Sequence, residues 1–301
     1  MKKTNTVNSL NEWPTWLAVV FVYSSWLLIL VNFNTTPLAP LLLVLVLGFH
    51  GSVQHELLHG HPTKYQVVND ILAYPPLSLW YPYPVYKNTH LRHHEDVDLT
   101  IPGVDPESYF VSPQEWQEMP QFYKLAAKVN MTLLGRLLFA PFWHFIDLKK
   151  QMLRSVSRPT SAIACIWLVH ELLCLILLIC VGLIFNVNVV LYFLCAYFAQ
   201  SLMLLRSFYE HRVEESPGHR SVVVESFLPF KLLFLNNNFH AVHHQNPGMS
   251  WFKLSKEYYS NRDYYDQQNN HFVESGYWRW FSKYAFKLVA QPKHPGILKD
   301  E

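Results

Sequence analysis

Two long uncharged stretches dominate this chain of 301 residues. Residues 13–55 contain no Lys, Arg, Asp or Glu, and residues 159–205 contain only one such residue, Glu171. A helix needs roughly 20 apolar residues to cross a bilayer, and each stretch is about twice as long. Half of the chain is apolar and only 15% is charged, which excludes a disordered chain and an ordinary soluble domain. We therefore expect each stretch to cross a membrane twice.

Short polar interruptions divide the two stretches. Residues 34–37 interrupt the first and residues 182–188 the second. The sequence therefore predicts an all-α, integral membrane protein whose four transmembrane helices form two hairpins. The expected spans lie near residues 15–33, 38–54, 160–184 and 189–207.

Basic residues indicate the orientation of these spans. The two short connections contain no Lys or Arg, whereas the other ends are flanked by Lys2, Lys3, Lys149, Lys150, Arg154, Arg158, Arg206 and Arg212. By the positive-inside rule both termini and the polar parts 55–158 and 208–301 face the cytoplasm. We expect these parts to form one helical cap, so that residues 1–301 make a single domain, and we assign this multi-pass protein to a bacterial inner membrane. The aromatic stretches 71–86 and 122–145 are expected at headgroup level.

Charge and cysteine content exclude other classes. The net charge is only +2 and no basic cluster is interleaved with aromatic residues, so nucleic acid is not an expected partner. All four cysteines lie in the second apolar stretch without C-x-x-C spacing, which predicts small buried side chains and no disulfide frame or metal knuckle. They are Cys165, Cys174, Cys180 and Cys195.

Histidines form a pattern of four short motifs. The motifs are HELLHGH from residue 55, HLRHH from 90, FYEHR around 211, and HAVHH from 240. Residues three and four apart share a helix face, so each motif can direct its imidazoles to one point. Clustered neutral imidazoles suit iron, zinc or copper, and not calcium or magnesium. Ten histidines belong to the pattern: His55, His59, His61, His90, His93, His94, His211, His240, His243 and His244.

The expected topology brings these motifs to one side of the membrane. The first motif ends the second span, and an even number of crossings separates it from the last. Eight or more imidazoles exceed what one tetrahedral or octahedral ion can use, which favours two ions. Two histidine-bound ions that face an apolar compartment suggest oxygen activation.

Three histidine boxes in this order, on a four-span scaffold, resemble the membrane fatty acid desaturase and hydroxylase superfamily over roughly residues 37–250. The resemblance implies a non-haem diiron centre that uses O2 to desaturate or hydroxylate a lipid-like substrate, foremost a fatty acyl chain. The run NNNFHAVHH at 236–244 is also similar to members that act on unusual substrates, such as carotenoid ketolases. A non-fatty-acyl specialised metabolite is therefore the alternative substrate. The iron ligands implied are His55, His59, His90, His93, His94, His211, His240, His243 and His244.

The expected chemistry requires partners. An unactivated C–H bond has no acidic proton and no leaving group, so a reduced metal centre with O2 must supply the oxidant. The sequence contains no flavin, haem or iron–sulfur motif. An external electron donor is therefore implied, either a ferredoxin or a cytochrome b5-type protein with its reductase.

Residues near the motifs are candidates to orient the ligands. Metal-bound imidazoles usually donate their other N–H to a carboxylate or carbonyl. Glu171, expected near mid-bilayer, is either functional or a protonated carboxyl bonded to His170 or Gln200, and His294 is expected at the surface. The orienting candidates are His61, Glu56, Asp96, Asp98, Asp105, Glu107, Glu210 and Asn238.

Two other classes of protein compete with the oxidase. His55, Glu56 and His59 spell H-E-x-x-H, the motif of zinc proteases, with Glu56 as a general base. An intramembrane protease needs only one further ligand, which leaves most patterned histidines unused. A metal transporter would place its ligands near the midplane of the spans and not at one rim. About two irons per chain would indicate the oxidase, and one zinc the protease.

Overall fold

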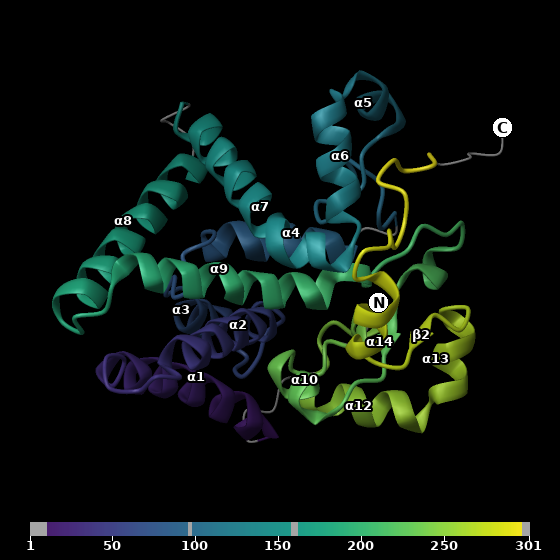
Figure 1. Cartoon of the computed structure of the whole chain (residues 1–301). Helices are drawn as coiled ribbons and strands as arrows, with labels where there is room; N and C mark the ends of the chain where they lie inside the picture. The colour runs from purple at the N-terminus through teal and green to yellow at the C-terminus, as the bar shows by residue number, and fades with distance from the viewer. Residues whose placement is uncertain (1–10, 96–97, 158–161, 297–301) are drawn as a thin grey trace. The chain divides into compact units, whose positions relative to one another are not determined.

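The computed structural model describes residues 11–95, 98–157 and 162–296 and is mostly helical (Figure 1). Its contacts divide the chain into two compact units. Unit 1 comprises Met1–Lys87 and Pro141–Met203, and unit 2 comprises Asn88–Ala140 and Leu204–Glu301.

Unit 1 contains the apolar helices. Within the described residues, four helices are long and apolar enough to cross a membrane, which equals the expected number of spans. The largest shift from the expected boundaries is in the second helix, which continues to Leu58 and so includes His55. The four helices are α1 (Trp13–Val31), α2 (Ala39–Leu58), α8 (Ala162–Leu183) and α9 (Val189–Arg206).

These four helices share one core. Leu30, Leu43, Val181 and Tyr192, one from each helix, are fully buried in the same cluster. The two short connections also meet, because Asn34 Nδ2 donates to the carbonyl of Asn186 at 3.0 Å.

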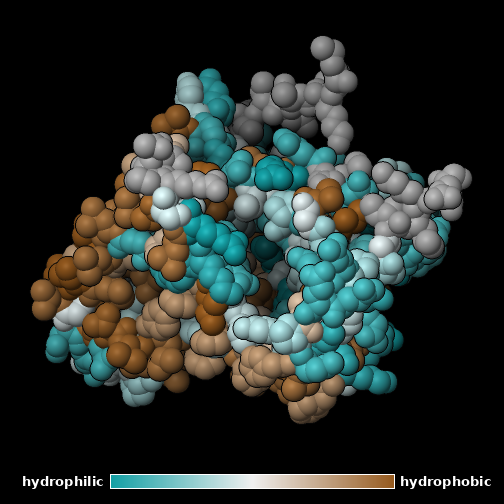
Figure 2. Space-filling model, turned by 90° about the horizontal axis from the view of Figure 1, so that it is seen from above, coloured by the Kyte–Doolittle hydropathy of each residue, from teal (hydrophilic) through white to brown (hydrophobic). Residues whose placement is uncertain are grey.

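The outer surfaces of the spans are apolar. Large side chains such as Leu17, Leu28, Leu168 and Leu175 are exposed, and Figure 2 shows apolar residues gathered over a broad area. An apolar exterior of this kind is stable when lipid, and not water, surrounds it.

The segment after α3 (Gln66–Ala73) lies among the spans. Leu77 belongs to the buried core of the four helices, and its carbonyl accepts a hydrogen bond from Tyr192 Oη at 2.7 Å. Trp80 Nε1 donates to the carbonyl of Ala196 at 3.0 Å. Irregular backbone at membrane depth is tolerated only where protein covers it and satisfies its polar groups. Part of the stretch 71–86 therefore packs against the four apolar helices.

At several single residues the structure also differs from the expectation. Glu171 forms an ion pair with Lys149 of α7 (Leu133–Val156), whereas one of its two expected roles was a bond to His170 or Gln200. Cys174 and Cys195 are buried as expected, but Cys165 is exposed and Cys180 partly exposed. His294 is buried, because its Nδ1 accepts from the Gly296 N–H at 3.1 Å and its ring packs on Phe110.

Unit 2 consists of short elements connected by loops. β1 and β2 form a small parallel sheet in which Val223 pairs with Val273 and Val224 with Glu274. The stretch 122–145 is divided between α6 and α7. The elements are α4 (Tyr83–Glu95), which enters the unit from Lys87, α5 (Pro113–Glu118), α6 (Gln121–Asn130), η2 (Ser207–Tyr209), η3 (Pro217–Arg220), β1 (Val223–Val224), α10 (Leu228–Leu233), α11 (His240–Gln245), α12 (Trp251–Ser260), α13 (Arg262–Gln268), β2 (Val273–Glu274) and α14 (Tyr277–Tyr284).

The strand β1 fixes the position of α11. The Ala241 N–H donates to the carbonyl of Val222 at 2.9 Å, and the Val224 N–H donates to the carbonyl of Asn238 at 2.7 Å. Phe239 and Val242 are fully buried against Val223 in one apolar cluster. The polar face of α11, which carries three histidines, is thereby held against the rest of the unit.

Candidate metal centre

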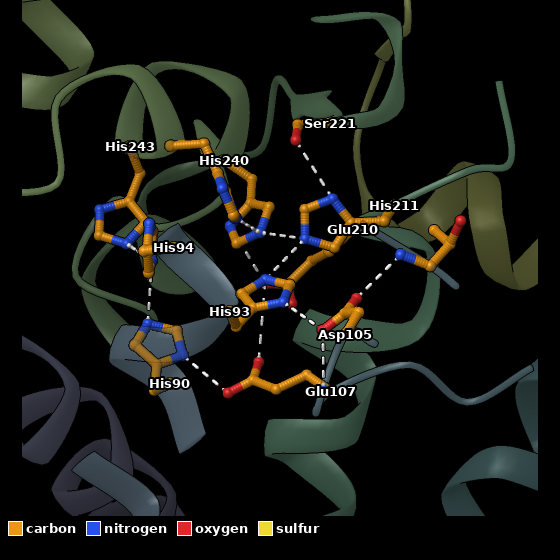
Figure 3. A network of polar contacts seen from close by, with 12 residues as sticks. His90, His93, His94, Asp105, Glu107, Glu210, His211, Ser221, His240 and His243 are labelled. Atoms are coloured by element: carbon orange, nitrogen blue, oxygen red, sulfur yellow. Dashed lines mark hydrogen bonds and ion pairs between the residues drawn. The ribbon is translucent and has the colours of Figure 1, made fainter. Parts of the chain in front are cut away.

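Four histidines of unit 2 form a compact cluster, which we call the four-histidine group. His93 comes from α4, His211 follows η2, and His240 and His244 lie one turn apart on α11. One ligand atom from each lies within 4.8 Å of all the others. His211 Nε2 lies 3.1 Å from both His93 Nε2 and His240 Nε2, and His240 Nε2 lies 3.1 Å from His244 Nε2. Figure 3 shows the rings of His93, His211 and His240 converging.

This geometry fits a transition metal. An ion with metal–nitrogen bonds of about 2.1 Å places adjacent ligand nitrogens about 3.0 Å apart in octahedral and about 3.4 Å apart in tetrahedral coordination. The observed separations of 3.1 Å fall within that range. Burial lowers the pKa values of His211, His240 and His244 well below the ordinary value. These imidazoles are therefore neutral, which is the form that binds metals.

Hydrogen bonds behind the rings direct the Nε2 atoms inward. His93 Nδ1 lies 2.7 Å from Asp105 Oδ1, and His211 Nδ1 lies 3.1 Å from Ser221 Oγ. Asp105 is itself held by the N–H groups of Thr100 and Glu107, at 2.8 and 2.9 Å. An Nδ1–H that donates to a carboxylate leaves Nε2 with the free lone pair that a metal requires.

Two carboxylates also give this site a preference for positive charge. Burial lowers the pKa of His93, but Glu107 and Asp105 outweigh burial and raise the pKa to about 9. Histidines in turn affect Glu107. Burial raises the pKa of the Glu107 carboxyl, but His90 and His93 outweigh burial and hold this pKa below its usual range. A cation at the centre of the rings is therefore stabilised by anionic groups behind them.

Three further histidines of unit 2 lie close together, and we call them the three-histidine group. His94 Nε2 lies 3.1 Å from His90 Nε2 and 3.0 Å from His243 Nε2. His90 Nδ1 lies 2.8 Å from Glu107 Oε1, while Glu107 Oε2 lies 4.0 Å from His93 Nε2 (Figure 3). Glu107 therefore lies next to both groups.

The first histidine box lies in unit 1. His55 is in the last turn of α2 and His59 follows its end, and their ring centroids are 4.8 Å apart. His61 is buried, with Nδ1 3.4 Å from Glu12 Oε2 and Nε2 4.0 Å from Glu56 Oε1. The helical i, i+4 spacing thus brings the expected ligand pair together, and carboxylates surround the neighbouring His61.

The remaining orienting candidates have different surroundings. Glu210 Oε1 lies 3.3 Å from Arg206 Nε and 3.6 Å from His240 Nδ1. Asp98 lies 4.0 Å from Arg220, and Asn238 Nδ2 donates to the carbonyl of Val224 at 2.6 Å. Of these three, Glu210 is the one placed beside a histidine of the cluster. Asp96 lies outside the described residues.

Sequence reasoning missed several residues around the histidines. Ser221 reaches His211 through an antiparallel bridge between the two residues, and no local pattern indicates such a contact. Tyr109 Oη donates to the main-chain carbonyl of His211 at 3.2 Å. Asn237, whose Oδ1 lies 3.4 Å from His240 Nδ1, could have been suspected from its place three residues before that histidine. Glu12 is the residue that precedes α1, and no sequence pattern indicated its contact with His61.

All the histidine boxes lie in a segment of the chain that matches a known protein family. The fatty acid desaturase family model matches residues 33–276, close to the range over which the histidine boxes predicted a resemblance. The chain therefore belongs to the fatty acid desaturase family of membrane desaturases and hydroxylases. The family indicates an oxidoreductase, and the four apolar helices agree with a membrane protein. No individual curated protein matches the chain.

Proposed function

We propose that this protein is an O2-dependent diiron oxidoreductase that desaturates or hydroxylates a fatty acyl chain. The observation that carries the proposal is the four-histidine group, in which the Nε2 atoms converge and three of their separations are 3.1 Å. Each of His93, His211 and His240 also has a polar partner on its Nδ1. Family membership supports iron as the metal.

We assign one iron to each histidine group. His93, His211, His240 and His244 are the proposed ligands of the first ion, and their mutual distances support this set. His90, His94 and His243 are proposed for the second ion, on the basis of their 3.0 and 3.1 Å separations. The family resemblance alone adds His55 and His59 to the second ion.

The protein's own contribution is to hold ligands and substrate in place. Reduced diiron with O2 supplies the oxidant that cleaves an unactivated C–H bond. Asp105 and Ser221 fix the orientation of His93 and His211, and burial of these rings excludes water from them. The position of the substrate carbon decides between loss of a second hydrogen and insertion of oxygen, because small displacements change rates strongly. Electrons come from a ferredoxin or cytochrome b5-type donor with its reductase.

We further propose that the four spans form two hairpins whose short connections face away from the cytoplasm. The bond between Asn34 and Asn186 supports a common side for the two connections. Basic residues at the opposite ends support cytoplasmic termini and a cytoplasmic cap that carries the histidine boxes. In this arrangement residues 1–301 act as one catalytic domain in a bacterial inner membrane.

The site also bears on two alternative functions, one with a different substrate and one with a different chemistry. A specialised metabolite in place of the acyl chain would use the same diiron chemistry. A zinc protease built on His55, Glu56 and His59 is disfavoured, because the four-histidine group forms without any of these residues.

Product analysis tests the proposal. Lipids and other apolar extracts from a host that expresses the protein are compared by mass spectrometry with those from a host expressing the His243→Ala variant. Loss of two hydrogens indicates desaturation, and gain of one oxygen indicates hydroxylation. Identical product profiles in the presence of O2 and a competent electron donor would contradict the proposed activity.

A further inference from the structure

The segment after β2 is strongly basic although the whole chain is almost neutral. Residues 275–294 contain Arg279, Lys283, Lys287 and Lys293 and no acidic residue. The segment includes α14 and the chain that follows it within unit 2. Arg279 and Lys283 are four residues apart, so α14 presents them on one side of the helix.

The helix α14 has two different apolar faces. Tyr277 and Trp280 are buried in a core with Phe208 and Phe234. Trp278 and Phe281 are exposed instead, and their rings stack with centroids 5.7 Å apart. Only the first face is used by the fold of the unit.

Large apolar side chains here are unusually accessible. Trp278 is 77% exposed and Phe286 is 86% exposed. Exposed apolar area is unfavourable in water, so these side chains are stabilised by any environment that covers them. Two large aromatic side chains beside several cations therefore point to an apolar and anionic partner.

The neighbouring helix α10 repeats this arrangement. Phe230 of α10 packs on Tyr277 with ring centroids 5.1 Å apart, so the two helices are in contact. Phe227, Leu228 and Leu232 are nevertheless exposed. Two adjacent short helices thus keep large apolar side chains outside their shared core.

We propose that α14, with α10 beside it, binds the surface of a bilayer that contains anionic lipids. A basic amphipathic helix with Trp and Phe on its apolar face lies in the plane of the interface. Trp278, Phe281 and Phe286 enter the boundary between headgroups and acyl chains. Arg279, Lys283 and Lys287 bind the anionic headgroups, whose negative potential attracts basic side chains near the surface. The contact anchors unit 2 to the membrane independently of the four spans.

Depth measurements in proteoliposomes test this proposal. Nitroxide labels are placed at residue 278 or 286 through Trp278→Cys or Phe286→Cys, in a full-length protein whose four native cysteines are replaced by alanine. A label introduced through Lys256→Cys on the exposed side of α12 is the matched control. In vesicles of phosphatidylcholine with phosphatidylglycerol, electron paramagnetic resonance should show that labels 278 and 286 collide rarely with a water-soluble nickel relaxation agent. The same labels should collide often with O2, which concentrates in the bilayer. Labels as accessible to nickel as label 256 would overturn the proposal.

Charge reversal tests the role of the cations. The variant Arg279→Glu/Lys283→Glu/Lys287→Glu should lose protection of label 278 in the anionic vesicles, while its iron content and gel-filtration profile match those of the labelled parent. Undiminished protection in this variant would refute headgroup binding. Protection that develops only when an acidic ferredoxin is added would assign the surface to a protein partner and would also overturn the proposal.

Discussion

The two histidine groups share helices α4 and α11 but differ in what lies behind their rings. His93, in the four-histidine group, is backed by Asp105, whose side chain is 2% exposed and receives two main-chain N–H groups. His90, in the three-histidine group, is backed by Glu107, whose side chain is 33% exposed. When a buried carboxylate is lost, water cannot easily take its place as the hydrogen-bond partner of the histidine, and the free-energy cost is large. When a partly exposed carboxylate is lost, water can take its place.

This difference indicates that the two proposed ions are held differently. The four-histidine group takes all its ligands and their partners from unit 2. The three-histidine group is proposed to need His55 and His59 from unit 1. We therefore expect the first ion to be the more tightly held and the second to respond to changes in both units.

Removing one ligand from either group should have the largest effect. His93→Ala and His243→Ala are each expected to abolish turnover, because each removes a proposed iron ligand and the proposed chemistry needs both ions. Turnover is measured as product formed with a saturating electron donor. His271→Ala, at an exposed histidine outside both groups, is the control and should retain activity. Full activity in either ligand variant would count against the assigned centre.

Removing the first histidine box should remove one of the two proposed ions and leave the other bound. His55→Ala/His59→Ala is expected to reduce iron from about two ions per chain to about one, because the four-histidine group contains neither residue. Iron is measured by mass spectrometry on purified protein. Unchanged iron content would show that this box holds no iron, and the comparison of the two groups would then fail.

Changing the carboxylates should sharpen the contrast between the groups. Asp105→Asn is expected to weaken iron binding by roughly 10–100-fold, the usual effect of losing the partner of a ligand histidine. Glu107→Gln should have the smaller effect, because its side chain is partly open to water. Competition with a chelator measures both affinities. A greater loss in Glu107→Gln would reverse the order proposed here.

Glu56 provides a smaller effect in unit 1. It lies 4.0 Å from His61 in a buried cluster with Glu12. Glu56→Gln is expected to reduce iron content without eliminating it, because we assign Glu56 an orienting role and not that of a ligand. Complete loss of metal, or replacement of iron by one zinc in the parent protein, would instead favour the protease reading of H-E-x-x-H.

Ser221 should give the smallest effect. Its hydroxyl lies 3.1 Å from His211 Nδ1, and a neutral hydrogen bond contributes about 0.5–1.5 kcal/mol. Ser221→Ala is therefore expected to lower iron affinity by roughly 2–10-fold. Titration with ferrous iron under anaerobic conditions measures the change. A loss as large as that in Asp105→Asn would show that His211 depends on this hydroxyl more than His93 does on its carboxylate.

The features that could be predicted from the sequence are those that depend on residues close together along the chain. Apolar length predicted four spans, and the i, i+3 and i+4 spacing predicted that His90, His93 and His94 belong on one helix with inward-directed rings. The burial of Leu77 among the apolar helices could not be predicted from the sequence, because its hydrogen-bond partner Tyr192 lies more than a hundred positions away. Lys149 with Glu171, and Ser221 with His211, likewise depend on tertiary placement. Ligand types were therefore predictable, whereas most of the partners that orient them were not.

The metal content of the unmodified protein tests the central claim most directly. Purified in detergent under anaerobic conditions, the protein should contain about two irons per chain and no stoichiometric zinc. Mössbauer spectra of protein enriched in 57Fe should show the iron in histidine-rich sites. A single zinc per chain, with iron absent and not restored by anaerobic loading, would contradict the diiron account.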